Sequence, residues 1–124
     1  MTKKRILIAA DESHILRILR FNLERAGYEI MTVEDGEAAL ETALAERPDL
    51  VILDVGMPGI TGVDVCRKLK GGDALDRTPV FLLTAHGQES DEQAGHAAGA
   101  DRFFTKPFSP KEILREVRNA LGDA

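Results

Sequence analysis

Residues 50–54 read Leu50-Val51-Ile52-Leu53-Asp54, a run of four apolar side chains that ends in a carboxylate. A continuously apolar run of this length is typical of a strand buried on both faces of a parallel sheet. We therefore expect a strand over Leu50–Leu53. Four similar short runs occur along the chain, two before this one and two after it. They are Arg5–Ala10, Glu29–Val33, Val80–Leu83 and Arg102–Thr105.

Five longer segments have helical periodicity, and capping residues mark their ends. Gly27 follows the first segment in the position of a C-terminal cap, whereas Ser13 and Ser109 are the expected N-caps of the first and last segments. The fourth segment has almost no large apolar residue, and Gly95 within it costs about 1 kcal/mol against alanine. We expect this helix to be the most mobile element. The segments are Ser13–Arg25, Gly36–Glu46, Gly62–Lys70, Glu89–Ala98 and Ser109–Leu121.

Five strands that alternate with five helices predict one α/β domain over residues 1–124, a doubly wound parallel sheet with helices on both faces. Domains of this class bind ligands beyond the carboxyl ends of their strands. Four of the predicted strands lead there into polar residues: Asp11 with Glu12, Asp54, Thr84 and Lys106. We expect their carboxylates, hydroxyl and ammonium to converge in one shallow crevice.

Carboxylates crowded into one crevice repel each other, so a cation is expected among them. Lys106 is one candidate. Mg²⁺ is another, because it takes one or two carboxylates together with carbonyl, water and phosphate oxygens. An aspartate beside Mg²⁺ can itself be the nucleophile that receives a phosphoryl group, while the metal ion and the lysine neutralise the developing charge.

The composition excludes several other classes of site. The 124 residues include 16 Lys and Arg against 21 Asp and Glu, a net charge of −5, so direct binding of nucleic acid or an acidic membrane is not expected. The single cysteine, Cys66, excludes an internal disulfide framework and a cysteine-rich zinc site, and we expect it to be a small buried hydrophobe. No apolar run approaches the ~20 residues that span a bilayer, and no signal peptide is evident. We expect a soluble, cytoplasmic protein.

Four short motifs occur in a fixed order along the whole chain. They are Ile6-Leu7-Ile8-Ala9-Ala10-Asp11-Glu12, then Asp49-Leu50-Val51-Ile52-Leu53-Asp54 with Met57-Pro58, then Leu83-Thr84-Ala85, and finally Gly99-Ala100-Asp101 running to Lys106-Pro107-Phe108. In order, spacing and coverage the chain resembles a receiver domain of two-component response regulators, the family of the chemotaxis regulator. The resemblance implies a flavodoxin-like sheet with strand order 2-1-3-4-5.

The resemblance also implies a role for each residue of the crevice. Asp54 would accept a phosphoryl group from a phosphohistidine, supplied by a sensor histidine kinase or a phosphotransfer protein. Asp11, Asp54 and the backbone carbonyl of Gly56 would hold Mg²⁺. Lys106 would contact the phosphoryl oxygens, and Thr84 would hydrogen-bond to one of them. Such a domain is a phosphoacceptor that catalyses only its own phosphorylation and dephosphorylation.

The family's switch maps onto the second half of the chain. Phe103 would be the aromatic residue that turns inward on activation, although packing in the core is the ordinary role of such a residue. The bond between Lys106 and Pro107 would be cis. The signal would leave through the surface of the fourth helix, fifth strand and fifth helix, toward a downstream protein or a second copy. His86, two residues beyond Thr84 at the mouth of the crevice, either influences the attack of water on the phosphorylated aspartate or is an ordinary exposed residue.

Two positions depart from the family's pattern. Receivers usually carry two acids at the end of the first strand, but the first of these is Ala10 here. Glu12 either compensates in part or continues into the loop. Gly56 has no side chain to shield the phosphoryl group, so metal affinity and phosphoryl lifetime stay open.

Two alternatives to the switch stay open beside these departures. One is a pseudo-receiver, a phosphate-independent interaction module for which Ala10 is the support. The other is a flavin-binding electron carrier. Such a carrier needs a Ser/Thr/Gly-rich loop after the first strand, which residues 11–14 do not provide.

Overall fold

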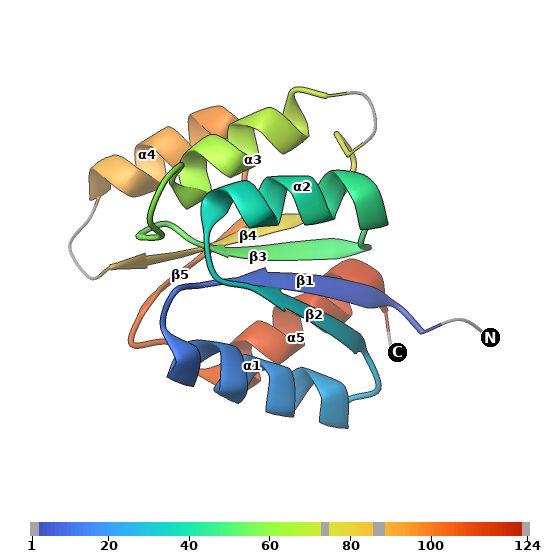
Figure 1. The fold of residues 1–124 in the computed structure, drawn as a ribbon. Helices are drawn as coiled ribbons and strands as arrows, with labels where there is room; N and C mark the ends of the chain where they lie inside the picture. Colours follow the sequence, from blue (N-terminus) through green and yellow to red (C-terminus); the bar gives the residue numbers. More distant parts are fainter. Residues whose placement is uncertain (1–2, 73–74, 86–88, 123–124) are drawn as a thin grey trace.

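The computed structural model describes residues 3–72, 75–85 and 89–122. Its five strands form one parallel sheet in the order β2-β1-β3-β4-β5, and the chain alternates strand and helix throughout, as predicted (Figure 1). The strands are β1 Arg5–Ala9, β2 Glu29–Val33, β3 Leu50–Asp54, β4 Val80–Ala85 and β5 Arg102–Lys106. The helices are α1 Ser13–Arg25, α2 Gly36–Glu46, α3 Gly62–Lys70, α4 Glu89–Ala98 and α5 Pro110–Leu121.

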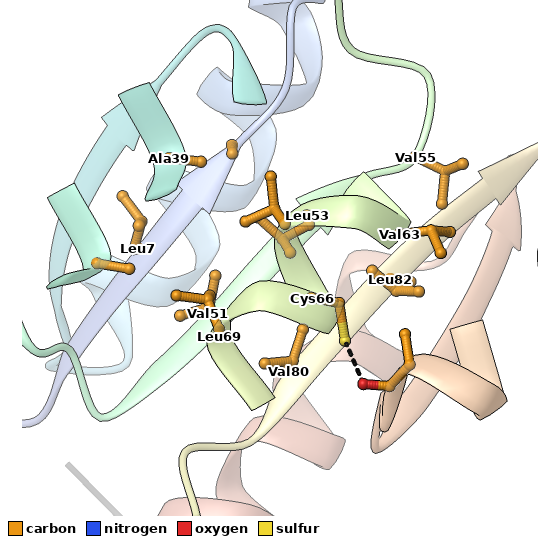
Figure 2. Packing of buried hydrophobic residues seen from close by; sticks show 14 of the residues in the cluster. Leu7, Ala39, Val51, Leu53, Val55, Val63, Cys66, Leu69, Val80 and Leu82 are labelled. Atoms are coloured by element: carbon orange, nitrogen blue, oxygen red, sulfur yellow. Dashed lines mark hydrogen bonds between the residues drawn. The ribbon is translucent and has the colours of Figure 1, made fainter. Parts of the chain in front are cut away.

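The central strands are apolar over most of their length because each of their faces is covered. Helices α2, α3 and α4 lie on one face of the sheet, and α1 and α5 lie on the other (Figure 1). Successive residues of β3 therefore enter different apolar clusters, with Val51 and Leu53 on the first face and Leu50 and Ile52 on the second. Figure 2 shows the first cluster, in which Leu82 of β4 lies close to Cys66 of α3.

The helix ends follow the capping chemistry of the sequence, with one exception. Gly27 adopts φ 102° after α1, and the N–H of Tyr28 donates to the carbonyl of Leu23 at 3.2 Å, which is a Schellman C-cap. Ser109 caps α5 by accepting from the N–H of Glu112 at 3.3 Å. The prediction that Ser13 caps α1 was wrong. Glu12 is the extended residue before the helix, and Ser13 is its first helical residue.

Three strands extend further at their carboxyl ends than the sequence predicted. Strand β3 includes Asp54, β4 includes Thr84 and Ala85, and β5 includes Lys106, whereas β1 ends one residue earlier, at Ala9. The ladder hydrogen bonds explain the difference, because Asp54 pairs with Leu83 and Thr84 pairs with Thr105. The polar residues at these carboxyl ends are therefore parts of the sheet itself.

Cys66 is fully buried, as predicted, and its thiol donates a weak hydrogen bond to the carbonyl of Ala98 at 3.8 Å (Figure 2). Burial raises the pKa of the Cys66 thiol to about 11, so this thiol is protonated at neutral pH.

The predicted mobility of α4 stays a prediction. Among the described residues, no helix has the length and apolar character needed to cross a bilayer.

Candidate functional site

Asp54 lies at the carboxyl end of the central strand β3, and each of its two carboxylate oxygens has a polar partner. The side chain is only 2% exposed. The ammonium of Lys106 lies 2.8 Å from Asp54 Oδ2, and the backbone N–H of Gly56 donates to Asp54 Oδ1 at 3.0 Å. A buried carboxylate needs such partners, because an unpaired charge away from water is costly. Strands β3 and β5 are not neighbours in the sheet, so the 52-residue separation of Lys106 and Asp54 is closed only by the fold.

Two further carboxylates lie beside Asp54, and the sequence predicted only one of them firmly. One oxygen from each of Asp11, Glu12 and Asp54 lies within 4.8 Å of the others. Glu12 also lies 3.6 Å from the ammonium of Lys106 and 3.3 Å from Nε2 of His14, which is 63% exposed. Three carboxylates therefore face one lysine, and the excess of negative charge favours binding of a cation.

Glu12 reaches the site because it does not act as an ordinary cap. Its backbone carbonyl accepts from the N–H groups of Ile15 and Leu16, at 3.1 and 3.3 Å, and so begins α1. Its side chain makes no capping hydrogen bond within the part of the chain that the structure describes. That side chain instead extends toward Lys106. Of the two possibilities that the sequence left open, the structure favours participation of Glu12 in the site.

Ala10, in contrast, points away from these carboxylates. It is fully buried and belongs to the apolar cluster beneath α1 and α5, together with Ile15. Its backbone N–H donates to the carbonyl of Val33 at 3.2 Å, which continues the ladder between β1 and β2. The methyl group of Ala10 is therefore part of the core packing.

Thr84 lies on β4, the strand next to that of Asp54, and Phe103 lies on β5, the strand beyond it. Thr84 is 1% exposed and pairs with Thr105 of β5, and the preceding residue, Leu83, pairs with Asp54 itself. Phe103 is half-buried and packs against the first apolar cluster, as its apolar strand indicated. Its ring also lies against His96 of α4, with the two ring centroids 4.4 Å apart.

A comparison with known protein families identifies the family of this chain. Residues 6–118 match the family model of the response regulator receiver domain. This chain belongs to that family. It is 43% identical to the alkaline phosphatase synthesis transcriptional regulatory protein PhoP of Bacillus subtilis over 118 residues, which make up 95% of this chain and 48% of that protein.

Solved structures agree with the family assignment. This receiver domain superposes on the chemotaxis response regulator CheY4 of Vibrio cholerae with a TM-score of 0.89 and 32% identity, over 97% of this chain and 100% of the other. It superposes on the receiver domain of the sensor histidine kinase PA1611 of Pseudomonas aeruginosa with a TM-score of 0.88 and 25% identity, over 98% and 100% of the two chains. That structure holds a magnesium ion in the active-site cleft.

This receiver domain spans about half the length of the curated relatives that it matches. Those relatives include PhoP and the phosphate regulon transcriptional regulatory protein PhoB of Rhizobium meliloti, which are named as regulators of transcription. The expectation of no direct nucleic-acid binding rests on the charge of these 124 residues. The comparisons do not support extending it to a whole protein.

The donor set of the receiver site suits a small, hard cation. Carboxylate oxygens are the ligands that Mg²⁺ prefers, and one or two of them with waters complete its coordination. Asp11 and Asp54 provide these oxygens within the 4.8 Å cluster, and Glu12 adds a third carboxylate. The residues present therefore fit a magnesium ion.

The structure brings together most of the residues predicted for this site. Asp11, Asp54 and Lys106 converge as expected, and Gly56 contacts Asp54 through its N–H. The peptide bond from Lys106 to Pro107 is cis. His86 lies outside the described residues. The sequence left open whether Glu12 joins this site or continues into the loop, and the structure places its carboxylate 3.6 Å from the ammonium of Lys106.

Proposed function

We propose that this receiver domain is a phosphorylation-dependent signalling switch with Asp54 as its phosphoacceptor. The setting of Asp54 carries the proposal: a buried carboxylate at a strand end, held by Lys106 and the Gly56 N–H and placed beside two other carboxylates. During transfer an Asp54 oxygen forms a bond to phosphorus while the bond from phosphorus to the donor's histidine nitrogen breaks. The electron pair of that bond remains on the nitrogen, and an acyl phosphate forms on Asp54.

The neighbouring residues would assist by stabilising charge. Lys106 would pair with the phosphoryl oxygens, because its ammonium already lies 2.8 Å from the acceptor carboxylate. Asp11, Asp54 and the backbone carbonyl of Gly56 would hold Mg²⁺, whose positive charge neutralises the oxygens of the transferred group. Thr84 would donate its hydroxyl hydrogen to one phosphoryl oxygen. Gly56 leaves the space beside Asp54 Oδ1 open, since a Cβ there would lie 3.7 Å away.

The phosphoryl donor would be a histidine kinase or a phosphotransfer protein that docks beside Lys106. A groove of about 430 Å³ runs from this lysine and Glu12 along α1 to Ile18 and Phe108. Ile18 is 42% exposed, and Phe21, one turn further along α1, is 58% exposed. A donor that must bring its phosphohistidine to Asp54 would cover this groove, because the groove and the site share residues.

The output surface would be formed by α4, β5 and α5, and Phe103 would couple it to the site. Phe103 lies on β5 one residue before the strand's buried Phe104, and Thr84 pairs with Thr105 just beyond. A downstream protein or a second copy of this chain would bind there. Because PhoP and PhoB are named as transcriptional regulators, we propose control of transcription as the output. We further propose that residues 1–124 make up one receiver domain that does not act on an external small-molecule substrate.

The alternative is a pseudo-receiver that binds partners without phosphate, and Ala10 is the observation that favours it. Incubation with acetyl phosphate and Mg²⁺ separates the two. We expect the intact mass to rise by one phosphoryl group in the parent and not in Asp54→Asn. An unchanged mass in the parent would support the pseudo-receiver.

Donor docking can be tested in the same system. Ile18→Glu is expected to slow transfer from a phosphorylated histidine donor while leaving transfer from acetyl phosphate unchanged. Equal slowing of both reactions would contradict docking at this groove.

A further inference from the structure

Helix α4 approaches the sheet unusually closely at Gly95. A Cβ added to Gly95 would lie 2.6 Å from Phe103 Cε1, 2.7 Å from Leu82 Cδ1 and 3.0 Å from Phe103 Cζ. Carbon atoms do not approach within 3.0 Å without displacement of one of them. The backbone of α4 therefore rests directly on the ring of Phe103.

Apart from Gly95, α4 is supported mainly by α3, whose Cys66 thiol donates to the carbonyl of Ala98 at 3.8 Å. The inward residues of α4 near Gly95 are Ala94 and Ala98, which present only methyl groups to the apolar cluster. The ring of His96, the residue after Gly95, contacts the Phe103 ring with a centroid distance of 4.4 Å and an interplanar angle of 48°. Gly95 and His96 thus enclose the Phe103 ring from the helix side, while Leu82 of β4 lies beside it. Figure 2 shows Leu82 among the core residues beneath α3 and α4.

We propose that Gly95 is the positioning residue through which the Phe103 ring sets the place of α4. Because residue 95 has no side chain, the backbone of α4 packs directly against the Phe103 ring. A displacement of the ring therefore changes the packing that holds α4 in place. A side chain at residue 95 would separate the two. The role of this contact in signalling rests on the proposed switch, but the contact itself does not.

The close approach of α4 to Phe103 explains why a glycine occupies the interior of this helix. Alanine in place of glycine favours an isolated helix about fivefold, so a glycine that only filled space would be replaced with a gain. At residue 95 the gain is opposed by overpacking against Phe103 and Leu82. The balance of these effects can be measured.

A thermodynamic cycle tests the contact in the protein without any phosphoryl group. We expect Gly95→Ala to lower the folding equilibrium constant in the parent, by up to about thirtyfold. In Phe103→Ala the same substitution should raise it about fivefold, because removal of the ring gives the Leu82 side chain space to move. Ala97→Gly, at an exposed position of the same helix, should lower it about fivefold in both backgrounds.

A gain from Gly95→Ala in the parent as large as in Phe103→Ala would overturn the proposal. If Gly95→Ala does not fold, recovery of a cooperative transition in Gly95→Ala/Phe103→Ala supports the proposal, and failure to recover it contradicts the proposal.

The response to beryllofluoride with Mg²⁺, which stands in for the phosphoryl group, separates positioning from mere packing. In the parent we expect amide signals of both Gly56 and α4 to shift. In Gly95→Ala the Gly56 signal should shift as in the parent, while α4 should be displaced beforehand and respond little further. A parental response of α4 in Gly95→Ala would refute the positioning role. If Gly56 does not respond in the parent, the proposed switch fails, and the cycle alone decides the contact.

Discussion

Replacement of Glu12 by glutamine is expected to weaken Mg²⁺ binding, because the Glu12 carboxylate lies beside those of Asp11 and Asp54 while Ala10 provides none. The carboxylate of Glu12 lies within 4.8 Å of those of Asp11 and Asp54 and 3.6 Å from Lys106, whereas Ala10 packs in the apolar core. Glutamine keeps the size of the side chain and removes only its charge. The change therefore tests the electrostatic contribution of Glu12 alone.

The size of the effect follows from the position of Glu12 at the rim. Loss of a group that contacts the ligands or bound waters of a metal ion, and not the ion itself, typically lowers metal affinity 10–100-fold. The Glu12 side chain is 43% exposed, so screening by water places the loss near the lower limit, about tenfold or 1.4 kcal/mol. For a domain of this size, that loss should remove about 4–7 °C of the melting-temperature rise produced by saturating Mg²⁺.

Thermal melting across a Mg²⁺ titration measures this directly. Glu24→Gln is the matched control, because Glu24 is an exposed acid on α1, the helix that Glu12 precedes, and forms an ion pair only with Arg20 among the described residues. Ala10→Asp should gain less than tenfold and should destabilise the metal-free protein, since it adds a fourth carboxylate near Asp11, Glu12 and Asp54 at a position packed in the apolar core. Equal Mg²⁺ affinities for the parent, Glu12→Gln and Ala10→Asp would refute the reasoning.

Three further predictions concern the metal site, the switch and the buried thiol. Asp11→Asn should be at least as stable as the parent without metal and should lose the Mg²⁺-dependent rise in melting temperature, because it removes both a repelling charge and a ligand. Thr84→Ala should still bind beryllofluoride at Asp54 but should largely lose the distant amide shifts of residues 89–104 on NMR titration. Burial raises the pKa of the Cys66 thiol from 9.0 to about 11, so its contribution to stability is complete below about pH 9 and is lost as pH rises toward 11. The parent should therefore lose unfolding free energy over that interval relative to Cys66→Val, measured with denaturant.

The sequence predicted those features that depend on local chemistry. The apolar run before Asp54 indicates a central strand because only a strand covered on both faces tolerates it, and Gly27 and Ser109 end or begin helices through their own backbone and side-chain bonds. The convergence of Asp11, Asp54 and Lys106 was predictable because parallel strands bring their carboxyl ends to one edge.

The features that the sequence did not predict depend on distances between elements. Glu12 could continue into the loop or join the site, and only the position of Lys106 across the sheet separates these possibilities. From the sequence, Gly95 was expected only to destabilise α4, whereas in the fold it lies against Phe103 of β5. Neither contact has a signal in local periodicity, because each joins residues whose separation is set by the packing of whole elements.

Whether Asp54 accepts the phosphoryl group can be determined by locating the modified residue. The parent is incubated with acetyl phosphate and Mg²⁺, the acyl phosphate is reduced with borohydride, and peptide mass spectrometry identifies the reduced side chain. We expect homoserine in place of Asp54, and no such product without Mg²⁺ or in Asp54→Asn. Modification of Asp11 or Glu12 instead, or no modified residue in the parent, would contradict the proposal for Asp54.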